Sequence, residues 1–354
     1  MVKATGSPSV MYDQLLDQVY AFITGEDGQV YINFLAQDQS NWGWAGLGAP
    51  KLGLSIGSPS AVLAGATYRV YVVDKAGNLC SHLNYTSGWV NEGQPLGDAF
   101  GNSKPAIGSP AAIYRQIDNS GHVFVVSNTG FLNVFISDGN EWNGPGPATS
   151  IFFNSPSAVY QSSIDRMCAF AVGSDNILYI YFYDQGNPAQ GQLQSLGSPP
   201  GALATGSPGA VYQSSIDRVH AFVVTTNSDL YLAYYDHDQA RWLWEFQDKS
   251  LGLLEMSSPS AVYQSSIDRV CAFVVRGDGH LYLNYFDHSQ GKWLWEDQGP
   301  PSTTVSATGS PGAVYQSSID RVHAFVVGSD GHLYVNYFDH GQGKWRWQDN
   351  ATPP

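Results

Sequence analysis

The chain has 354 residues, and its 16 Lys and Arg residues against 30 Asp and Glu residues give a formal charge of −14. A nucleic-acid-binding protein needs a basic surface to neutralise phosphates, so this balance argues against a nucleic-acid partner and equally against an anionic membrane surface. Aromatic residues make up 13% of the chain, which excludes a disordered protein, and no apolar run reaches the roughly 20 residues of a membrane-spanning helix.

Seven related segments, each beginning with Ser-Pro, divide the chain into a repeat array. Loose copies start at residues 7, 58 and 109, and four close copies, reading SPSAVYQSSIDR or SPGAVYQSSIDR, start at 155, 207, 258 and 310. Successive starts differ by 51, 51, 46, 52, 51 and 52 residues. We therefore expect a single domain over residues 1–354 with seven units, at 7–57, 58–108, 109–154, 155–206, 207–257, 258–309 and 310–354.

The last unit shows the predicted strands most clearly, because apolar residues alternate with a period of two rather than 3.6. An Asp-Gly turn at 330–331 is typical of a β-hairpin. No segment has a helical pattern of apolar residues. Four strands are predicted in this unit, at Ser310–Gln316, Arg321–Val327, His332–Asp339 and Lys344–Asp349.

Seven antiparallel four-stranded units predict an all-β protein, a seven-bladed β-propeller with four strands in each blade. One blade cannot bury both of its faces alone, and a ring of blades covers them. Each repeat begins at its first strand and ends at its fourth, so we expect no strand exchange between the two ends of the chain.

The run AVYQSSIDRVHAFVVGSDGHLYVNYFDHGQGKWRWQD at 313–349 resembles the blades of Photorhabdus-type lectins, through its VHAFVVGSDGHLYVNYFD hairpin and its WxW strand. The resemblance spans all seven units, specifically in the last four and loosely in the first three. It implies a seven-bladed propeller that binds fucose, galactose or O-methylated sugars between blades, at many sites in each ring.

The six-bladed fungal fucose lectins are more distantly similar, and they hold the sugar with an Arg on the second strand and a Glu on the third. Only the second unit has Arg at the matching second-strand position, so that site is not transferred to this chain. The residues at this position, in unit order, are Tyr20, Arg69, His122, Cys168, His220, Cys271 and His323.

Two loops of each unit, before the second strand and before the fourth, open on the same end of a blade and gather polar and aromatic residues. Charged groups bond pairs of sugar hydroxyls with direction, and an aromatic ring covers the apolar side of the sugar. The candidate ligand-binding residues are Asp217, Arg218, Asp268, Arg269, Asp320 and Arg321, the histidines His237, His288 and His340, and the tryptophans Trp42, Trp44, Trp242, Trp244, Trp293, Trp295, Trp345 and Trp347.

Structural roles compete with each of these assignments. The Asp-Arg pairs could fix their own loops, the tryptophans could form core between blades, and the loop histidines could cap turns. The mid-strand residues His220 and His323 are expected to be packed. Unit 4 lacks both tryptophans and unit 2 lacks the loop Asp, so sugar sites are expected in units 5 to 7, with unit 1 as a further candidate.

The polar groups recur with the repeat, whereas a catalytic set would occur once, so we expect no enzyme activity and no cofactor. One Asp in each hairpin turn is too few ligands for calcium, and no His or Cys cluster has zinc spacing, so no metal is expected. The three cysteines are an odd number and suit a reducing compartment. Cys168 and Cys271 occupy equivalent positions in units that are not adjacent, so we expect no disulfide between them.

These observations predict a multivalent carbohydrate-binding protein without catalysis, whose partners are glycans on glycoproteins or cell surfaces. It would not insert into membranes, and homo-oligomerisation stays open. The alternatives are a protein–protein interaction scaffold and, less favoured, a glycan hydrolase. The N-terminus shows no signal peptide, so we expect a cytoplasmic protein or one released without such a signal; removal of a leader would allow secretion.

Overall fold

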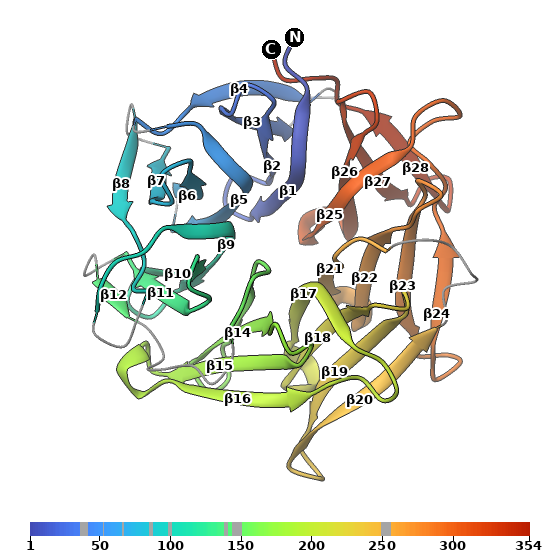
Figure 1. Ribbon diagram of the computed structural model, residues 1–354. Helices are drawn as coiled ribbons and strands as arrows, with labels where there is room; N and C mark the ends of the chain where they lie inside the picture. The colour runs from blue at the N-terminus through green and yellow to red at the C-terminus, as the bar shows by residue number, and fades with distance from the viewer. Residues whose placement is uncertain are drawn as a thin grey trace.

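The structure is a computed structural model that describes residues 1–35, 42–51, 53–65, 67–84, 88–97, 101–137, 141–143, 151–248 and 256–354. In these residues, seven antiparallel four-stranded sheets surround a central axis as the blades of a propeller (Figure 1). The seven-bladed all-β fold predicted from the repeat is confirmed. No helix in the described part of the chain is long and apolar enough to cross a membrane.

Each blade consists of four consecutive strands, and the first strand lies closest to the axis. Blades 1 to 3 are β1–β4 (Ala4–Asp13, Gln18–Gly25, Val30–Leu35, Gly43–Gly48), β5–β8 (Ser55–Ala64, Thr67–Asp74, Leu79–Leu83, Trp89–Gly93) and β9–β12 (Ala106–Arg115, Ser120–Ser127, Leu132–Ile136, Glu141–Asn143). Blades 4 and 5 are β13–β16 (Ser157–Gln161, Arg166–Val172, Leu178–Asp184, Gln192–Gly197) and β17–β20 (Ala204–Gln213, Arg218–Thr225, Leu230–Asp236, Arg241–Asp248). Blades 6 and 7 are β21–β24 (Ser260–Gln264, Arg269–Val275, Leu281–Asp287, Lys292–Asp297) and β25–β28 (Ala307–Gln316, Arg321–Gly328, Leu333–Asp339, Lys344–Asp349).

In the described residues, helical structure is confined to single 3₁₀ turns. Three of them occupy the loop between the first and second strands of blades 5, 6 and 7, and one lies between the third and fourth strands of blade 4. Their bounds are Pro188–Gln190 (η1), Ser214–Ile216 (η2), Ser265–Ile267 (η3) and Ser317–Ile319 (η4).

The Ser-Pro dipeptide that marks the repeat lies where the pairing of the innermost strand changes register. In β25 this shift falls between Thr308 and Gly312. Proline has no N–H to donate to the neighbouring strand, so the regular ladder cannot continue through it. Gly309 has a φ of +67°, and a Cβ there would lie 3.2 Å from the backbone oxygen of Gly6 in the adjacent blade. The Gly-Ser-Pro sequence at the start of the repeat is therefore explained by the close packing of first strands around the axis.

Serine hydroxyls accept hydrogen bonds from the first strand of the neighbouring blade, including across the junction between the last blade and the first. The backbone N–H of Ser7 donates to Ser58 Oγ at 2.8 Å, and that of Ser310 donates to Ser7 Oγ at 3.2 Å. At the same junction of last and first blades, Val2 N donates to the carbonyl of Pro353 at 3.2 Å. All four strands of blade 7 come from the end of the chain, so the prediction of no strand exchange is confirmed.

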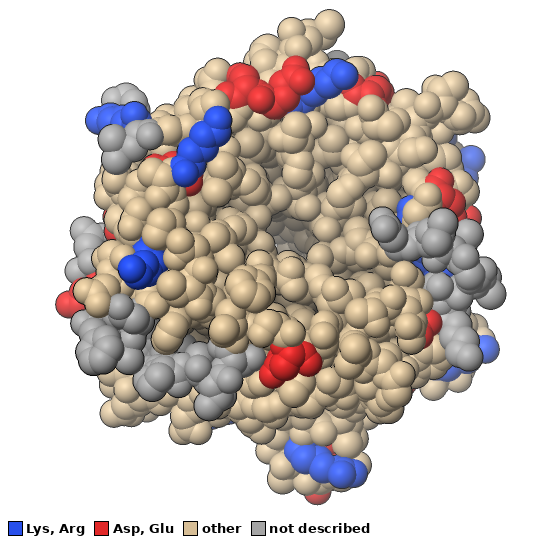
Figure 2. All heavy atoms as spheres, viewed as in Figure 1, with Lys and Arg blue, Asp and Glu red and all other residues tan. Residues whose placement is uncertain are grey.

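The hydrophobic core lies between blades. In the interface of blades 5 and 6, for example, the buried side chains of Phe222 and Leu232 pack with those of Val270 and Val274. The three cysteines are buried and free, as the sequence predicts for the pair in blades 4 and 6. On the face shown in Figure 2, charged side chains lie mainly toward the rim, and uncharged residues surround the hollow at the centre.

Candidate functional site

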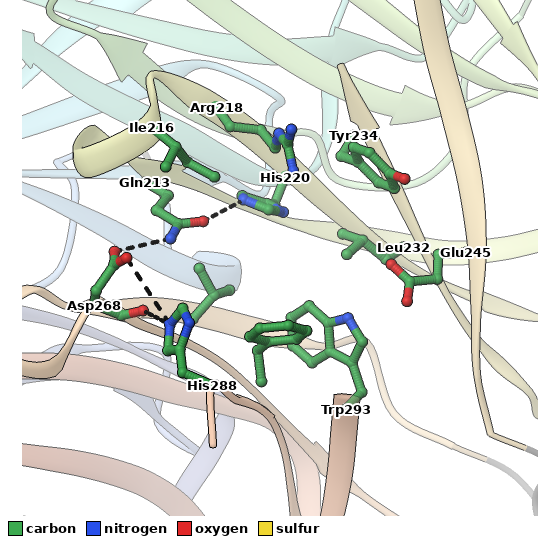
Figure 3. A pocket seen from close by; sticks show the side chains of 12 residues that line it. Gln213, Ile216, Arg218, His220, Leu232, Tyr234, Glu245, Asp268, His288 and Trp293 are labelled. Carbon is green, nitrogen blue, oxygen red and sulfur yellow. Dashed lines mark hydrogen bonds and ion pairs between the residues drawn. The ribbon is translucent and has the colours of Figure 1, made fainter. Parts of the chain in front are cut away.

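Two equivalent pockets open between blades, one between blades 5 and 6 (the 5/6 pocket) and one between blades 6 and 7 (the 6/7 pocket). Their cavity volumes are about 140 and 330 Å³. The 5/6 pocket is lined by Gln213, Ile216, Arg218, His220, Leu232, Tyr234 and Glu245 of blade 5 and by Asp268, Val270, Phe286, His288 and Trp293 of blade 6 (Figure 3). The 6/7 pocket is lined by Gln264, Ile267, Arg269, Cys271, Leu283, Tyr285, Glu296, Asp320, Val322, Phe338, His340 and Trp345.

An arginine with unused donors forms the basic side of each pocket. The guanidinium of Arg218 lies 5.0 Å from the centre of the Tyr234 ring, and that of Arg269 lies 4.7 Å from the Tyr285 ring. The Nε atoms of both arginines are buried and have no hydrogen-bond partner among the described residues. A guanidinium presents a fork of N–H donors, a geometry that matches paired acceptors.

A glutamate stands opposite the arginine and supplies acceptors. Burial raises the pKa of Glu245, while a hydrogen bond from Trp293 and the charge of Arg218 lower it, and the net shift is upward. The indole of Trp293 packs edge-on against Phe222 and Phe286, with ring centres 5.6 Å apart in both pairs. Each pocket therefore combines a charged donor, a carboxylate and an aromatic wall.

The loop aspartates fasten adjacent blades. Asp268 Oδ1 accepts hydrogen bonds from Gln213 Nε2 at 2.9 Å and Tyr263 OH at 2.8 Å, and also from the Ser215 hydroxyl. Burial raises the pKa of Asp268, but the hydrogen bonds from Ser215, Gln213 and Tyr263 outweigh it, and the net shift is downward. Equivalent donors surround the loop aspartates Asp17, Asp217 and Asp320, whereas Asp165 of blade 4 is bonded by Tyr160 and by Arg115 in place of the glutamine.

The Asp-Arg pair of one loop serves two different pockets. Asp268 lines the 5/6 pocket, whereas Arg269 lines the 6/7 pocket. Successive residues at the start of a strand point to opposite faces of the sheet. The repeat pattern suggests that the pair is one feature of one unit, whereas in the structure each pocket combines the arginine of one blade with the aspartate of the next.

The loop histidines tie two loops of their own blade together. Their Nε2–H groups donate to the backbone oxygen of the loop aspartate, as in the 2.6 Å bond from His288 to Asp268. His237 and His340 form the equivalent bonds at 2.8 and 2.6 Å. His288 and His340 also line the two pockets, so their ligand-binding role stays a prediction beside an observed structural one.

The two tryptophans of the WxW strand occupy different positions. The first, Trp293 or Trp345, lines a pocket. The second donates its indole N–H to the backbone of the preceding blade, as Trp295 does to Gln247 O at 3.2 Å. Trp44, Trp244 and Trp347 form the same link, at 2.7, 3.0 and 2.8 Å. Trp42 and Trp242 pack edge-on against Phe325 and Phe170 of the neighbouring blades.

Several pocket residues are absent from the sequence prediction. Glu245 and Glu296 directly follow the WxW motif in blades 5 and 6, whereas blade 7 has Gln348 there. The recurring WLWE string is the signal that could have identified them. The pocket tyrosines, Tyr234 and Tyr285, resemble the strand-forming residues around them and carry no such signal.

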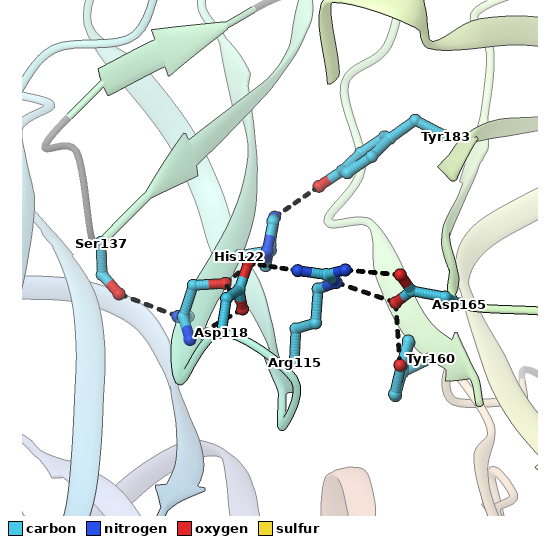
Figure 4. A network of polar contacts seen from close by, with 9 residues as sticks. Arg115, Asp118, His122, Ser137, Tyr160, Asp165 and Tyr183 are labelled. Atoms are coloured by element: carbon cyan, nitrogen blue, oxygen red, sulfur yellow. Dashed lines mark hydrogen bonds and ion pairs between the residues drawn. The ribbon is translucent and has the colours of Figure 1, made fainter. Parts of the chain in front are cut away.

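At the interface of blades 3 and 4, polar side chains of the protein itself form a network beside the hydrophobic core (Figure 4). Arg115 replaces the glutamine found in blades 4 to 7, and it binds Asp165 through Nε at 2.8 Å and through Nη2 at 2.5 Å. Its remaining Nη1 contacts Asp118. Burial lowers the pKa of His122 to about 4, and its Nδ1 is bonded to the hydroxyl of the fully buried Tyr183 at 2.8 Å.

The described residues contain no cluster of three or more His, Cys, Asp or Glu side chains that could hold a metal ion. No family model matches this sequence, and no curated protein matches it.

Solved structures resemble the fold over most of its length. The BP39L lectin from Burkholderia pseudomallei has a TM-score of 0.71 at 21% identity, with 97% of this chain and 98% of that chain covered. The six-bladed lectin of Aleuria aurantia, described with a fucose recognition mode, has a TM-score of 0.56 at 15% identity, covering 99% and 96%. A Bacteroides uniformis protein assigned as a 6-phosphogluconolactonase has a TM-score of 0.53 at 12% identity, covering 82% and 83%. At these identities the likeness shows the fold alone.

Proposed function

We propose that the 5/6 and 6/7 pockets bind single sugar units of glycans, and that the protein is a multivalent lectin without catalysis. The main support is that Arg218, Glu245 and Trp293 line one pocket at the junction of two blades. The next junction repeats this set as Arg269, Glu296 and Trp345. Concave sites with an apolar wall and a few convergent polar groups are typical of small-molecule binding. Here the polar groups are complementary donors and acceptors, which suit pairs of hydroxyls.

Repetition favours binding over chemistry. A glycan hydrolase needs one pair of carboxylates in defined acid and base roles. Glu245 and Asp268 recur as Glu296 and Asp320, and both aspartates use Oδ1 to hold a neighbouring loop. Several weak sites in one ring increase the avidity for a surface that carries many copies of a glycan. Glycans on glycoproteins or cell surfaces are therefore the proposed partners.

The proposed sugars are fucose, galactose and O-methylated sugars, and the proposed family is that of the Photorhabdus-type lectins. The resemblance of the last four repeats to those lectins supports this choice. Two structural neighbours, of which one is described with fucose recognition, are lectins of the same general architecture.

The test is a glycan array followed by calorimetric titration of the sugars that bind. Replacing the pocket arginines together (Arg218→Met and Arg269→Met) should weaken binding about 10- to 100-fold, because each removes hydrogen bonds from a charged donor. The side chain of the exposed Arg241 bonds to Gln239 and to no other described residue, so Arg241→Met is the matched control and should bind like the unmodified protein. A blank array and no heat with any monosaccharide would contradict the proposal and favour the scaffold alternative.

A further inference from the structure

One substitution separates the 5/6 pocket from the 6/7 pocket. Of the twelve residues that line each, eleven are of the same type at equivalent positions. The exception is on the second strand, where the 5/6 pocket has His220 and the 6/7 pocket has Cys271. These side chains are 5% and 2% exposed, so they form the floor of the pockets. The two pockets therefore have the same lining except for the residue at the floor.

The residue at this second-strand position alternates around the last four blades. It is Cys168 in blade 4, His220 in blade 5, Cys271 in blade 6 and His323 in blade 7. Both histidines bond through Nε2 to the glutamine at the end of their blade's first strand, at 2.9 Å to Gln213 Oε1 and 3.0 Å to the equivalent oxygen in blade 7. His220 and His323 therefore have the same hydrogen-bonded arrangement.

The hydrogen-bond chain fixes which ring nitrogen carries the proton. Asp268 is a carboxylate and accepts, so the amide N–H of Gln213 donates to it at 2.9 Å. The amide oxygen of Gln213 must then accept, and the group that donates to it is His220 Nε2–H. Burial and the charge of Arg218 lower the pKa of His220 to about 3, so the ring is neutral and Nδ1 carries no proton.

This leaves a bare acceptor at the floor of the 5/6 pocket. His220 Nδ1 is buried and has no hydrogen-bond partner in the described part of the chain, and the same is true of the equivalent atom of His323. A buried acceptor without a donor is costly, and a ligand that supplies the donor recovers that cost. A sugar hydroxyl directed at the floor would supply it.

The 6/7 pocket has a different floor. The thiol of Cys271 makes no hydrogen bond to the described residues, and burial raises its pKa to about 12, so it stays protonated and behaves as a small apolar group. The cavity is also larger, about 330 Å³ against 140 Å³. This floor offers no strong acceptor to a hydroxyl and leaves more space for an apolar substituent.

We infer that the two floors select different sugar edges: the 5/6 pocket binds an edge that presents a free hydroxyl to His220 Nδ1, and the 6/7 pocket also accepts an edge on which that hydroxyl is O-methylated. The inference rests on the proposed function, since it assigns specificity within the same sugar sites. Sites built to hydrogen-bond a hydroxyl reject analogues without it strongly, whereas apolar sites discriminate weakly between such analogues.

The experiment compares the pockets with two parent sugars, methyl α-L-fucoside and methyl β-D-galactoside, and all their mono-O-methyl derivatives. Occupancy at each pocket is measured in soaked crystals, and affinity is measured by titration. A parent sugar is expected in both pockets. At least one of its derivatives should occupy the 6/7 pocket with no more than a twofold loss of affinity, and should bind the 5/6 pocket about 10- to 100-fold more weakly than the parent.

Exchanging the floors should exchange the selectivity. His220→Cys creates a combination that blade 6 already contains, so it is expected to fold, and it should allow the O-methyl derivative into the 5/6 pocket. Cys271→His should exclude that derivative from the 6/7 pocket. Cys271→Ala keeps a small apolar floor and should leave the selectivity of the 6/7 pocket unchanged.

The outcomes separate this inference from the proposed function. If a parent sugar binds both pockets but no derivative distinguishes them, or if His220→Cys leaves the selectivity of the 5/6 pocket unchanged, the inference is wrong and the lectin function stands. Loss of the derivative from the Cys271→Ala variant would likewise overturn the role of the floor. If neither parent binds at either pocket, the proposed function fails, and this inference fails with it.

Discussion

The loop aspartates show how a single residue can combine a turn conformation with a contact between blades. Asp268 has a φ of 53°, in the left-handed region that Asp and Asn tolerate better than most residues. The hairpin-like spacing of QSSIDR indicates a loop, but the donors to Asp268 come partly from the preceding blade, about one repeat away in the sequence. Such partners cannot be predicted from one unit alone, because they depend on how far neighbouring blades are rotated and translated.

Replacing Asp268 with Ala should lower the free energy of unfolding by roughly 2 kcal/mol, since it removes a charged acceptor of three hydrogen bonds and places Ala in the left-handed region. Urea unfolding followed by tryptophan fluorescence measures this. Asp238→Ala is a suitable control, because Asp238 is an exposed loop residue of blade 5. Equal stabilities of the two variants would show that the observed bonds do not fasten the blades.

The buried histidines predict that stability falls as the pH drops below about 6.5. Burial lowers the pKa of His220 and His323 to about 3 and that of His122 to about 4, from an ordinary value of 6.5. Above pH 6.5 neither the folded nor the unfolded chain protonates them. Below it the unfolded chain takes up protons that the folded chain excludes, so the unfolded state gains stability. The lowered pKa values of Asp17, Asp217, Asp268 and Asp320 act in the same direction below about 3.8.

Removing one of these histidines should flatten the pH dependence. His220→Cys should reduce the slope of unfolding free energy between pH 6 and pH 4 by about 1.4 kcal/mol per pH unit, the value for one proton. Cys271→Ala changes the same position of the next blade without removing a histidine and should keep the original slope. An unchanged slope in His220→Cys would mean that this ring is protonated in the folded state.

The elements themselves were largely predictable from the sequence. In blade 7 the second, third and fourth strands begin and end within one residue of the predicted bounds, and β25 starts at Ala307, three residues before the predicted Ser310. That difference arises because a proline usually marks the edge of a strand, whereas here the pairing shifts register and resumes beyond it. The alternation in the WxW string puts Trp345 and Trp347 on one face of β28, and both pack against the same core cluster. It could not show their different positions relative to the pocket mouth, because that depends on the neighbouring blade.

The two tryptophans of one strand should therefore respond differently to substitution. Trp295→Phe removes an N–H that reaches Gln247 O and should cost about 1 kcal/mol of stability, with little change in sugar affinity at the 5/6 pocket. Trp293→Phe reduces the aromatic wall and removes the hydrogen bond to Glu245, so it should weaken sugar binding there about tenfold. Thermal unfolding and calorimetry on both variants distinguish the roles. If Trp295→Phe weakened sugar binding and Trp293→Phe changed only the stability, the two roles would be assigned to the wrong residues.

The whole ring repeats its fold more regularly than its site. The serine contacts near the axis recur even in the most divergent blades, as between Ser58 and Ser109 at 2.8 Å. The interblade polar groups do not recur in this way. Arg115 is bound by two aspartates at the junction of blades 3 and 4, and in blade 4 Arg166 is paired with Asp184 at 2.6 Å. An arginine neutralised by the protein has fewer donors left for a ligand, so we expect sugar sites on only part of the ring.

Binding should consequently be uneven around the propeller, with full-strength sites at the 5/6 and 6/7 pockets and a weaker one between blades 7 and 1. At that last junction Arg321 lies 4.9 Å from the Tyr337 ring with an unpartnered Nε, and Trp42 packs nearby against His323, so the basic and aromatic sides are in place within the described residues. Among the residues that the structure describes, the acidic side is missing at this junction. Gln348, which pairs with Val335, occupies the position that Glu245 has in blade 5, where it pairs with Leu232.

Gln348→Glu should therefore strengthen the junction of blades 7 and 1, by about tenfold for the gain of one charged acceptor. Crystals soaked with the parent sugar would show its density rise toward that of the 5/6 pocket, and the titrated stoichiometry would increase. The reverse change, Glu245→Gln, is the matched comparison and should reduce the 5/6 pocket to the weaker class. Equal occupancy at all seven junctions of the unmodified protein, or density confined to blades 2 to 4, would show that these residues do not determine where the sugar binds.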